Sequence, residues 1–178
     1  MLSESARMSS AAEARFRINA PNAKPRNIKV IALDRPSEAL VTRLAQSRWN
    51  GASFFTASAF APQSHAGGEG EHAAPGRFSM QGWLSDLAGR TKDLVDEVDH
   101  ADLVVMVATA GEDAAAATLI GEACSLKRVN TTGLILGGRA ATDEMLSKTL
   151  SRLRPWSLML VIASGEDYIE DMLIALRA

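Results

Sequence analysis

The residues best suited to chemistry in this sequence stand just after four apolar runs. Glycines in such places let backbone N–H groups approach a phosphate, and carboxylates can bind Mg²⁺ beside a phosphate. The same carboxylates can instead cap the free N–H groups of a helix that begins there. The candidate residues are Asp34 and Arg35 after the run that ends at Leu33; Gly111, Glu112 and Asp113 after the run that ends at Ala108; Gly137, Gly138 and Arg139 after the run that ends at Leu136; and Gly165, Glu166 and Asp167 after the run that ends at Ala163.

Five apolar runs, separated by helical patterns, predict the elements that position these residues. Runs that are too short for helices and apolar throughout are typical of buried parallel strands. The predicted fold is therefore a doubly wound α/β domain: a mainly parallel sheet of about five strands with helices on both faces, in a three-layer Rossmann-like arrangement. Ligands of such sheets bind at the carboxyl ends of the strands. The runs are Ile28–Leu33, Ala52–Ser58, Leu103–Ala108, Thr132–Leu136 and Ser157–Ala163.

The segments between the runs carry helix signals. Pro36 suits the first turn of a helix that Asp34 or Ser37 can cap, and Thr142 can cap a later helix. Glu112 or Asp113 can cap the helix that follows the central run, and residues 167–176 form a closing helix. One more helix is predicted before Leu103, with its apolar stripe in the core. That stripe consists of Trp83, Leu84, Leu87, Thr91, Leu94, Val95 and Val98.

Two segments are predicted to be mobile. Residues 1–27 are rich in Ala, Ser and Arg and read as a flexible, mildly basic tail that could contact an acidic partner. Residues 28–178 form a single domain, interrupted at about 61–77 by a loop rich in Gly, His, Ser and Pro. His65 and His72 lie in that loop, but their spacing fits no familiar metal-ligand pattern, so a solvated loop is the preferred interpretation.

Composition excludes several classes of protein. The chain has 178 residues and a net charge of −2, so no strong field favours nucleic acid or a membrane surface. No apolar run is long enough to span a bilayer. The N-terminus lacks a secretory pattern, so a cytoplasmic location is expected. The single cysteine, Cys124, is interpreted as a small buried apolar residue, with a reactive thiol as the alternative.

The order and spacing of these runs resemble a known family. IKVIAL, GASFFTAS, ADLVVMVATAG with its small-residue helix, TTGLIL and LRPWSLMLVIAS follow one another much as the strands do in the nucleotide-binding half of FtsZ, the tubulin-like bacterial division GTPase. The resemblance covers residues 28–165 and rests on pattern more than identity. It implies a Rossmann-like GTPase fold that binds GTP or GDP with Mg²⁺ and assembles with copies of itself.

The sequence departs from that family where its chemistry lies. The loop of residues 34–37 has no glycine, and its proline has no N–H to donate. The loop after the run Leu103–Ala108 has one glycine, Gly111, where the family has a cluster of glycines. It carries Glu112 and Asp113 where a phosphate would need room. The acidic loop of a further domain, which completes the family's hydrolytic site, is not expected in this chain. The resemblance therefore implies a degenerate relative, a pseudo-GTPase with no catalytic residue.

Three functions remain open at this stage. The leading hypothesis is a non-catalytic binding or assembly module that acts through protein contact, as a subunit or regulator of a complex or by self-association, with no cofactor. The first alternative is a GTP-binding switch with a rebuilt, Mg²⁺-assisted site at Asp34, Glu112 and Asp113. The second is a flavodoxin-like domain that binds a small molecule or cofactor, with residues 137–139 as the anion contact.

Overall fold

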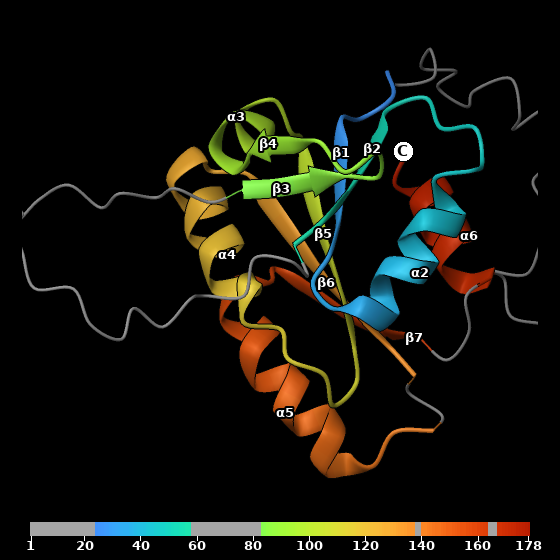
Figure 1. The fold of residues 1–178 in the computed structure, drawn as a ribbon, viewed down its shortest axis with the longest axis vertical. Coiled ribbons are helices and arrows are strands. Elements are labelled where there is room, and N and C mark those ends of the chain that lie inside the picture. The colour runs from blue at the N-terminus through green and yellow to red at the C-terminus, as the bar shows by residue number, and fades with distance from the viewer. Residues whose placement is uncertain (1–23, 58–82, 138–139, 164–166) are drawn as a thin grey trace, which may run out of the picture.

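The computed structural model describes residues 24–57, 83–137, 140–163 and 167–178, which form one seven-stranded sheet with helices (Figure 1). The strands are β1 (Ile28–Ala32), β2 (Ala52–Thr56), β3 (Trp83–Asp86), β4 (Thr91–Asp93), β5 (Leu103–Thr109), β6 (Asn130–Leu136) and β7 (Met159–Ala163). The helices are α2 (Arg35–Leu44), α3 (Leu94–Asp99), α4 (Ala116–Lys127), α5 (Asp143–Leu153), the short 3₁₀ helix η2 (Arg154–Trp156) and α6 (Asp167–Ala175).

The sheet has the order β4-β3-β2-β1-β5-β6-β7. Five neighbouring strands of this sheet pair in parallel: β2, β1, β5, β6 and β7. The other two, β3 and β4, extend the sheet beyond β2 as antiparallel strands. Taken alone, the parallel strands follow the order 2-1-3-4-5, one of the two common orders of doubly wound folds. The predicted fold class is confirmed, with seven strands rather than about five.

The prediction of one helix through the stripe of residues 83–98 was wrong. Asp86 accepts hydrogen bonds from the N–H groups of Ala88 and Arg90, and Gly89 has a φ of 75°, so the chain turns back as the β3–β4 hairpin. Asp93 then caps α3 by accepting from the N–H groups of Val95 and Asp96. Leu84 and Leu94 are buried as predicted, but as members of a strand and a short helix.

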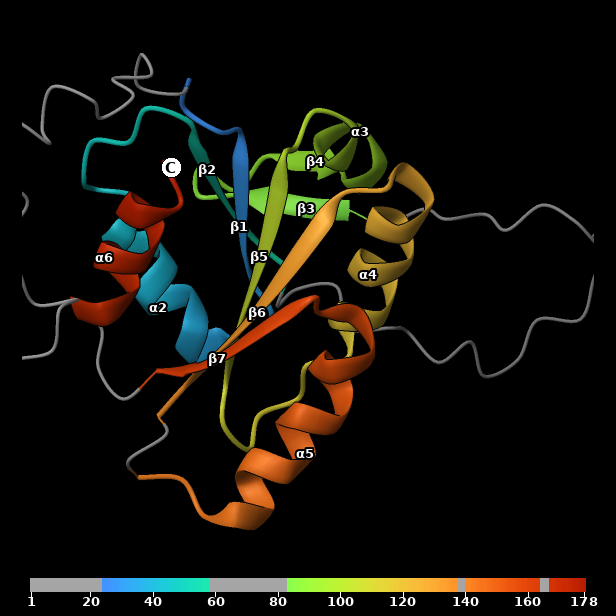
Figure 2. The ribbon, with the colours of Figure 1, turned by 180° about the vertical axis from the view of Figure 1, so that it is seen from behind.

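Helices cover the two faces of the sheet separately (Figures 1 and 2). On one face, Leu40 and Val41 of α2 and Leu173 of α6 pack on Val30 and Val105 of the central strands. The other face packs against α3, α4 and α5, and its core consists largely of Ile31, Leu94, Val98, Val104, Met106, Ile120, Cys124, Ile135 and Leu153. Both faces of β1 and β5 are thus buried, which explains why these strands are apolar apart from Lys29 of β1, whose ammonium group pairs with Glu97.

One close approach fixes α4 against the end of α5. A Cβ built on Gly121, in the middle of α4, would lie 2.6 Å from side-chain atoms of Trp156 in η2. Glycine in a helix interior costs stability relative to alanine, so its presence here is explained by the indole that packs against it.

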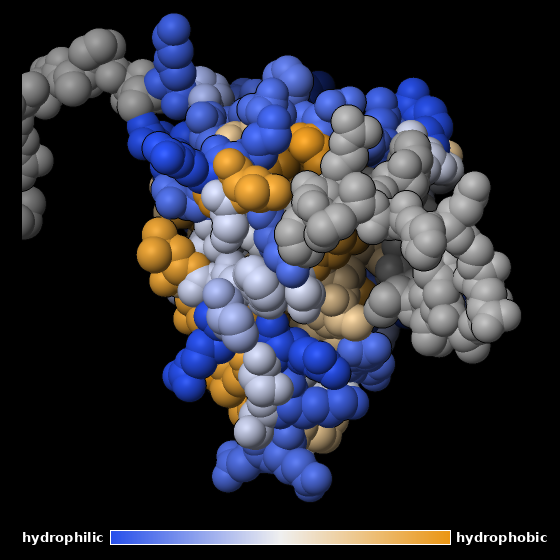
Figure 3. All heavy atoms as spheres, turned by 90° about the vertical axis from the view of Figure 1, so that its left-hand side faces the viewer, coloured by the Kyte–Doolittle hydropathy of each residue, from blue (hydrophilic) through white to orange (hydrophobic). Residues whose placement is uncertain are grey.

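The face that presents α3 and α4 carries apolar residues in separated patches among hydrophilic ones (Figure 3). Within the described ranges, no helix has both the length and the hydropathy needed to cross a bilayer.

Candidate functional site at the carboxyl edge of the sheet

The strand order places a switch point between β1 and β5. The chain leaves β1 through α2 on one face and leaves β5 through α4 on the other, so the loops after these strands diverge. In doubly wound folds the ligand binds in the crevice that this divergence opens, at the N-terminus of the first helix. Asp34 and the segment 109–115 occupy the corresponding positions here.

Asp34 fills this position with its own carboxylate. Its Oδ1 accepts a hydrogen bond of 2.8 Å from the N–H of Ser37 in the first turn of α2, and one of 3.0 Å from the Thr109 hydroxyl. Its Oδ2 accepts a 2.7 Å bond from the N–H of Thr109. The residue is 6% exposed. A buried anion is therefore held by two backbone N–H groups and one hydroxyl, on both sides of the switch point.

The carboxylate also continues the sheet. The last backbone hydrogen bond between β1 and β5 runs from the N–H of Leu33 to the carbonyl of Val107. The next donor along β5 is the N–H of Thr109, and the Asp34 side chain accepts from it. Ser37 completes a capping box, since its hydroxyl accepts from the Asp34 N–H. The prediction that Asp34 caps the first helix is confirmed, but contact with β5 was not foreseen.

Few donors at the start of α2 remain for an external anion. Pro36 has no N–H, the N–H of Ser37 is taken by Asp34, and that of Glu38 is bonded to the Asp34 carbonyl. Of the first four residues of α2, all of which the structure describes, Arg35 alone keeps a backbone N–H that is not bonded to Asp34. The Arg35 side chain is exposed.

The loop after β5 is tied to α5. The N–H of Gly111 donates to the hydroxyl of buried Thr149 at 2.9 Å, and Lys148 donates to the Gly111 carbonyl at 2.9 Å. Gly111 has a φ of 89°, and a Cβ there would lie 2.8 Å from Cε of Met145. Glycine is needed here because of its backbone conformation and the contact with α5, and its N–H is already bonded within the chain.

The predicted capping of α4 by Glu112 or Asp113 was wrong. The helix begins at Ala116, its N-cap is Ala115, and no side chain caps it. Asp113 instead accepts from the N–H of Ala115 at 3.1 Å, one residue outside the helix, because a carboxylate folds back readily onto a nearby N–H in a turn. Both acids are exposed, whereas Asp34 is buried. Of the three acids proposed together as a Mg²⁺ site, Asp34 is thus buried and hydrogen-bonded within the fold, whereas Glu112 and Asp113 are exposed to solvent.

Of the remaining candidates, the structure describes Gly137 and Asp167. Gly137 follows β6 with a φ of 85°, and its carbonyl accepts from the N–H groups of Ala140 and Ala141. Gly138, Arg139, Gly165 and Glu166 lie outside the described residues, as do residues 1–23 and the predicted loop at 61–77. Asp167 is the first residue of α6. No cluster of three or more potential metal ligands exists within the part of the chain that the structure describes.

Sequence reasoning missed Thr109 and Lys148 at this edge, and it predicted the burial of Thr149 but not its contact with the loop after β5. Thr109 is the polar last residue of an otherwise apolar strand, and that polarity was the available signal. Thr149 is fully buried on the inner face of α5 among apolar neighbours, where a hydroxyl indicates a hydrogen-bond partner.

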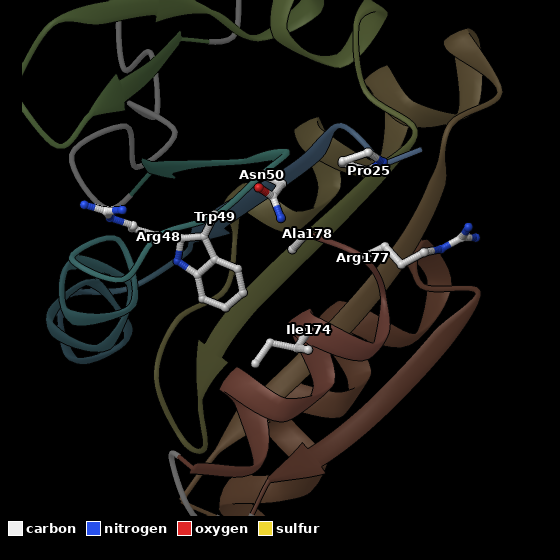
Figure 4. A pocket seen from close by; sticks show the side chains of 7 residues that line it. All are labelled: Pro25, Arg48, Trp49, Asn50, Ile174, Arg177 and Ala178. Atoms are coloured by element: carbon white, nitrogen blue, oxygen red, sulfur yellow. The ribbon is translucent and has the colours of Figure 1, made fainter. Parts of the chain in front are cut away.

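A hollow of about 500 Å³ lies at the opposite edge of the sheet, between the α2–β2 connection and the end of α6 (Figure 4). Trp49 and Ile174 face it, whereas the guanidinium groups of Arg48 and Arg177 extend to opposite sides. Polar groups therefore do not converge on this hollow, as they do in a typical small-molecule site. Its lining is Pro25, Arg48, Trp49, Asn50, Ile174, Arg177 and Ala178.

No protein-family model and no curated protein sequence matches the chain. Among solved structures, the chain is similar to translation elongation factor SelB from Methanococcus maripaludis. The complex of SelB with the GTP analogue GppNHp matches with a TM-score of 0.48 and 11% identity over 86% of this chain and 34% of that one. The apo form matches with a TM-score of 0.44 and 13% identity over 87% and 34%. The chain thus spans about a third of these SelB chains, and neither of them is an FtsZ.

Proposed function

We propose that this domain is a non-catalytic binding module that acts through protein contact and has given up anion binding at its switch point. The observation that carries the proposal is the buried Asp34 carboxylate, which accepts the hydrogen bonds that a phosphate would accept in a doubly wound nucleotide-binding domain. The fold then serves to present surfaces that contact other proteins, and not to form a ligand-binding crevice.

Electrostatics support this proposal. A phosphate placed about 4 Å from the Asp34 carboxylate would meet a repulsion of roughly 4 kcal/mol per unit charge at an effective dielectric constant of 20. Displacing the side chain would avoid that repulsion but would break its three hydrogen bonds, two of which link the end of β1 to β5 through Thr109. Both routes reduce the affinity for nucleotide by several orders of magnitude, since each 1.4 kcal/mol is a factor of ten.

The proposal accommodates descent from the FtsZ family, which remains a hypothesis drawn from the sequence. A relative that lost its glycine loops would keep the alternation of strands and helices and would fill the vacated anion position with a side chain of its own. Asp34, in a loop without glycine, fits that expectation.

Calorimetric titration of the full chain with GTP, GDP and ATP, each with and without Mg²⁺, tests the proposal. No heat of binding is expected up to millimolar nucleotide. Micromolar affinity would overturn the proposal in favour of a GTP-binding protein with a rebuilt site. In that case Asp113→Ala should weaken binding, with Asp99→Ala, an exposed carboxylate paired with Lys127 and remote from this edge, as the control.

The strand order favours one second candidate, a flavodoxin-like domain that binds a small molecule. Its parallel strands follow the order in which such domains bind a cofactor at the switch point. Native mass spectrometry of the protein purified from its own cell tests this candidate, because a retained ligand would add a fixed mass to 19.0 kDa.

A further inference from the structure

The hollow between the α2–β2 connection and the end of α6 has a composition typical of protein-contact sites (Figure 4). Trp49 and Ile174 face it, and the charged side chains among its described lining residues are Arg48 and Arg177. Tryptophan and arginine are enriched in the hot spots of protein interfaces. A hollow on which polar groups do not converge also favours an interface over a small-molecule site. We define Arg48, Trp49, Ile174 and Arg177 as the basic hollow.

Trp49 is held in place although it is only partly buried. Its indole N–H donates to the carbonyl of Leu44 at the end of α2, at 2.6 Å. Its ring packs on Phe54 of β2, with the ring centroids 5.9 Å apart. Ile174, which also faces the hollow, is 59% exposed. Because a side chain that is fixed before binding loses little conformational freedom on contact, Trp49 is well suited to pack against an apolar side chain of a partner.

The backbone around the hollow is fixed as well. The N–H of Arg26 donates to the carbonyl of Arg177, and the N–H of Ile28 donates to the carbonyl of Gly51, each at 2.9 Å. A Cβ on Gly51 would clash with the Arg26 carbonyl oxygen, so these two segments touch directly. Segments from three parts of the chain are thus joined around the hollow, and its shape does not depend on a partner.

Arg177 stands at a position where glycine is usual. It is the C′ residue of a Schellman motif that ends α6, because its N–H donates to the Ile174 carbonyl and the N–H of Ala178 donates to the Leu173 carbonyl. Its φ is 68°, a left-handed conformation that disfavours a side chain. Glycine would end the helix at lower cost, so capping does not explain the arginine. Its guanidinium group extends from the rim of the hollow, where contact with a partner would explain it (Figure 4).

The positive charge of the basic hollow is not neutralised. Arg48 and Arg177 are exposed, and neither has an ion-pair partner among the described residues. The carboxylate of Glu170, one turn before Ile174, accepts from the Ser47 hydroxyl at 3.4 Å and is not part of the lining. The two guanidinium groups extend to opposite sides of the apolar centre (Figure 4). A complementary ligand therefore has an apolar group in its middle and negative charge on both sides.

We propose that the basic hollow binds an acidic segment of a partner protein. One large apolar side chain of that segment packs between Trp49 and Ile174, and carboxylates before and after it pair with Arg48 and Arg177. The proposal rests on the proposed function, because it names the kind of partner that a protein-contact module would bind. The contact lies at the edge of the sheet opposite Asp34, so it does not require the switch point.

NMR titration of the full chain with a model peptide tests the proposal. The probe is a peptide with one central phenylalanine and three glutamates on each side. The observed signal is the indole N–H of Trp49, identified as the one that Trp49→Phe removes, and we expect it to shift saturably. A peptide with lysine in place of glutamate, or with serine in place of phenylalanine, should bind at least tenfold more weakly. Added salt should weaken binding of the glutamate peptide, because the arginines are exposed.

Charge reversal tests the two arginines. Arg48→Glu and Arg177→Glu should each raise the dissociation constant of the glutamate peptide at least tenfold. Arg152→Glu, at an exposed position on α5, is the matched control and should leave it unchanged. The double variant Arg48→Glu/Arg177→Glu should prefer the lysine peptide, because its rim then carries the opposite charge.

The apolar contact is tested by Ile174→Ser, with Ile162→Ser, an exposed isoleucine on β7, as its control. Only the first should weaken binding of the glutamate peptide, and circular dichroism verifies that both variants are folded.

The absence of a saturable shift with the glutamate peptide would overturn the proposal, as would binding that both charge reversals leave intact. Tighter binding of a single-stranded oligonucleotide at Trp49 would also overturn it and would assign the hollow to nucleic acid. Peptide binding that requires removal of residues 1–23 would overturn it in favour of the chain's own N-terminal segment as the occupant. A dimer of the full chain that Arg48→Glu dissociates would overturn it in favour of a second copy.

The nucleotide titration distinguishes this proposal from the proposed function. A protein that binds neither the glutamate peptide nor a nucleotide refutes the acidic partner alone. A protein that binds the peptide at the basic hollow and also binds GTP with micromolar affinity refutes the proposed function alone.

Discussion

Replacing Asp34 by Asn separates two roles that the carboxylate could have. As a plain helix N-cap, Asn and Asp are equivalent within a few tenths of a kcal/mol. In this structure both carboxylate oxygens accept backbone N–H groups, from Ser37 and from Thr109. An amide has one oxygen, so in Asp34→Asn its NH₂ group must face one of these donors. We therefore expect Asp34→Asn to be clearly destabilising.

The loss in the free energy of unfolding can be estimated from the hydrogen bonds that each variant removes. A buried N–H left without a partner costs about 1–3 kcal/mol, which is the loss expected for Asp34→Asn. Asp34→Ala also removes the cap, worth about 1 kcal/mol, for a total of roughly 2–4 kcal/mol. Thr109→Val removes only the hydroxyl bond, at about 1 kcal/mol. Because that bond is lost once only, the double variant Asp34→Ala/Thr109→Val should fall short of additivity by about 1 kcal/mol.

Urea unfolding monitored by circular dichroism measures these losses, with Thr142→Asn as the control. Thr142 caps α5 through one bond, to the N–H of Met145, so Asn should replace it at little cost. Equal tolerance of Asn at positions 34 and 142 would refute the reasoning, since Asp34 would then be an ordinary cap without a structural contact to β5.

Three further predictions follow from packing. Gly121→Ala should lower stability by about 1–3 kcal/mol in thermal unfolding, despite its better helix propensity, because the new Cβ meets Trp156. Gly111→Ala should cost at least about 1 kcal/mol in the same assay, because its φ of 89° disfavours a side chain; an unchanged midpoint would contradict this. Burial raises the pKa of the Cys124 thiol from 9.0 to about 12. The folded protein should therefore resist thiol reagents, and its stability should fall as pH rises from about 9 toward 12, where the unfolded chain alone loses the proton; labelling as fast as in the urea-unfolded protein would contradict this.

The core of the fold was predictable because its strands are buried on both faces. In β5, burial on two sides leaves a continuous apolar run that has few other interpretations, and in β1 Lys29 alone interrupts such a run. The β3–β4 hairpin was not predictable in this way. Leu84, Leu87 and Leu94 also fit helical spacing, and the turn at Asp86 depends on side-chain hydrogen bonds that periodicity does not record.

The candidate site was predictable only in part. The position of Asp34 followed from its place after the first strand, and capping followed from its residue type. Its contact with Thr109 joins residues 75 apart, and it depends on the pairing of β1 with β5, which one sequence does not specify. Glu112 and Asp113 were equally good caps by type, but α4 begins further on, at Ala116.

The central claim is that the Asp34 carboxylate occupies the position of a bound anion. It is tested most directly by removing this carboxylate and adding an external anion, inorganic phosphate. Asp34→Gly leaves the donors of Ser37 and Thr109 around an empty position, and glycine is itself a tolerated N-cap. The melting temperature of this variant should rise with inorganic phosphate by several degrees more than that of the wild type at equal ionic strength. Equal shifts in the two proteins would contradict the claim, because the donors around Asp34 would then not form an anion site.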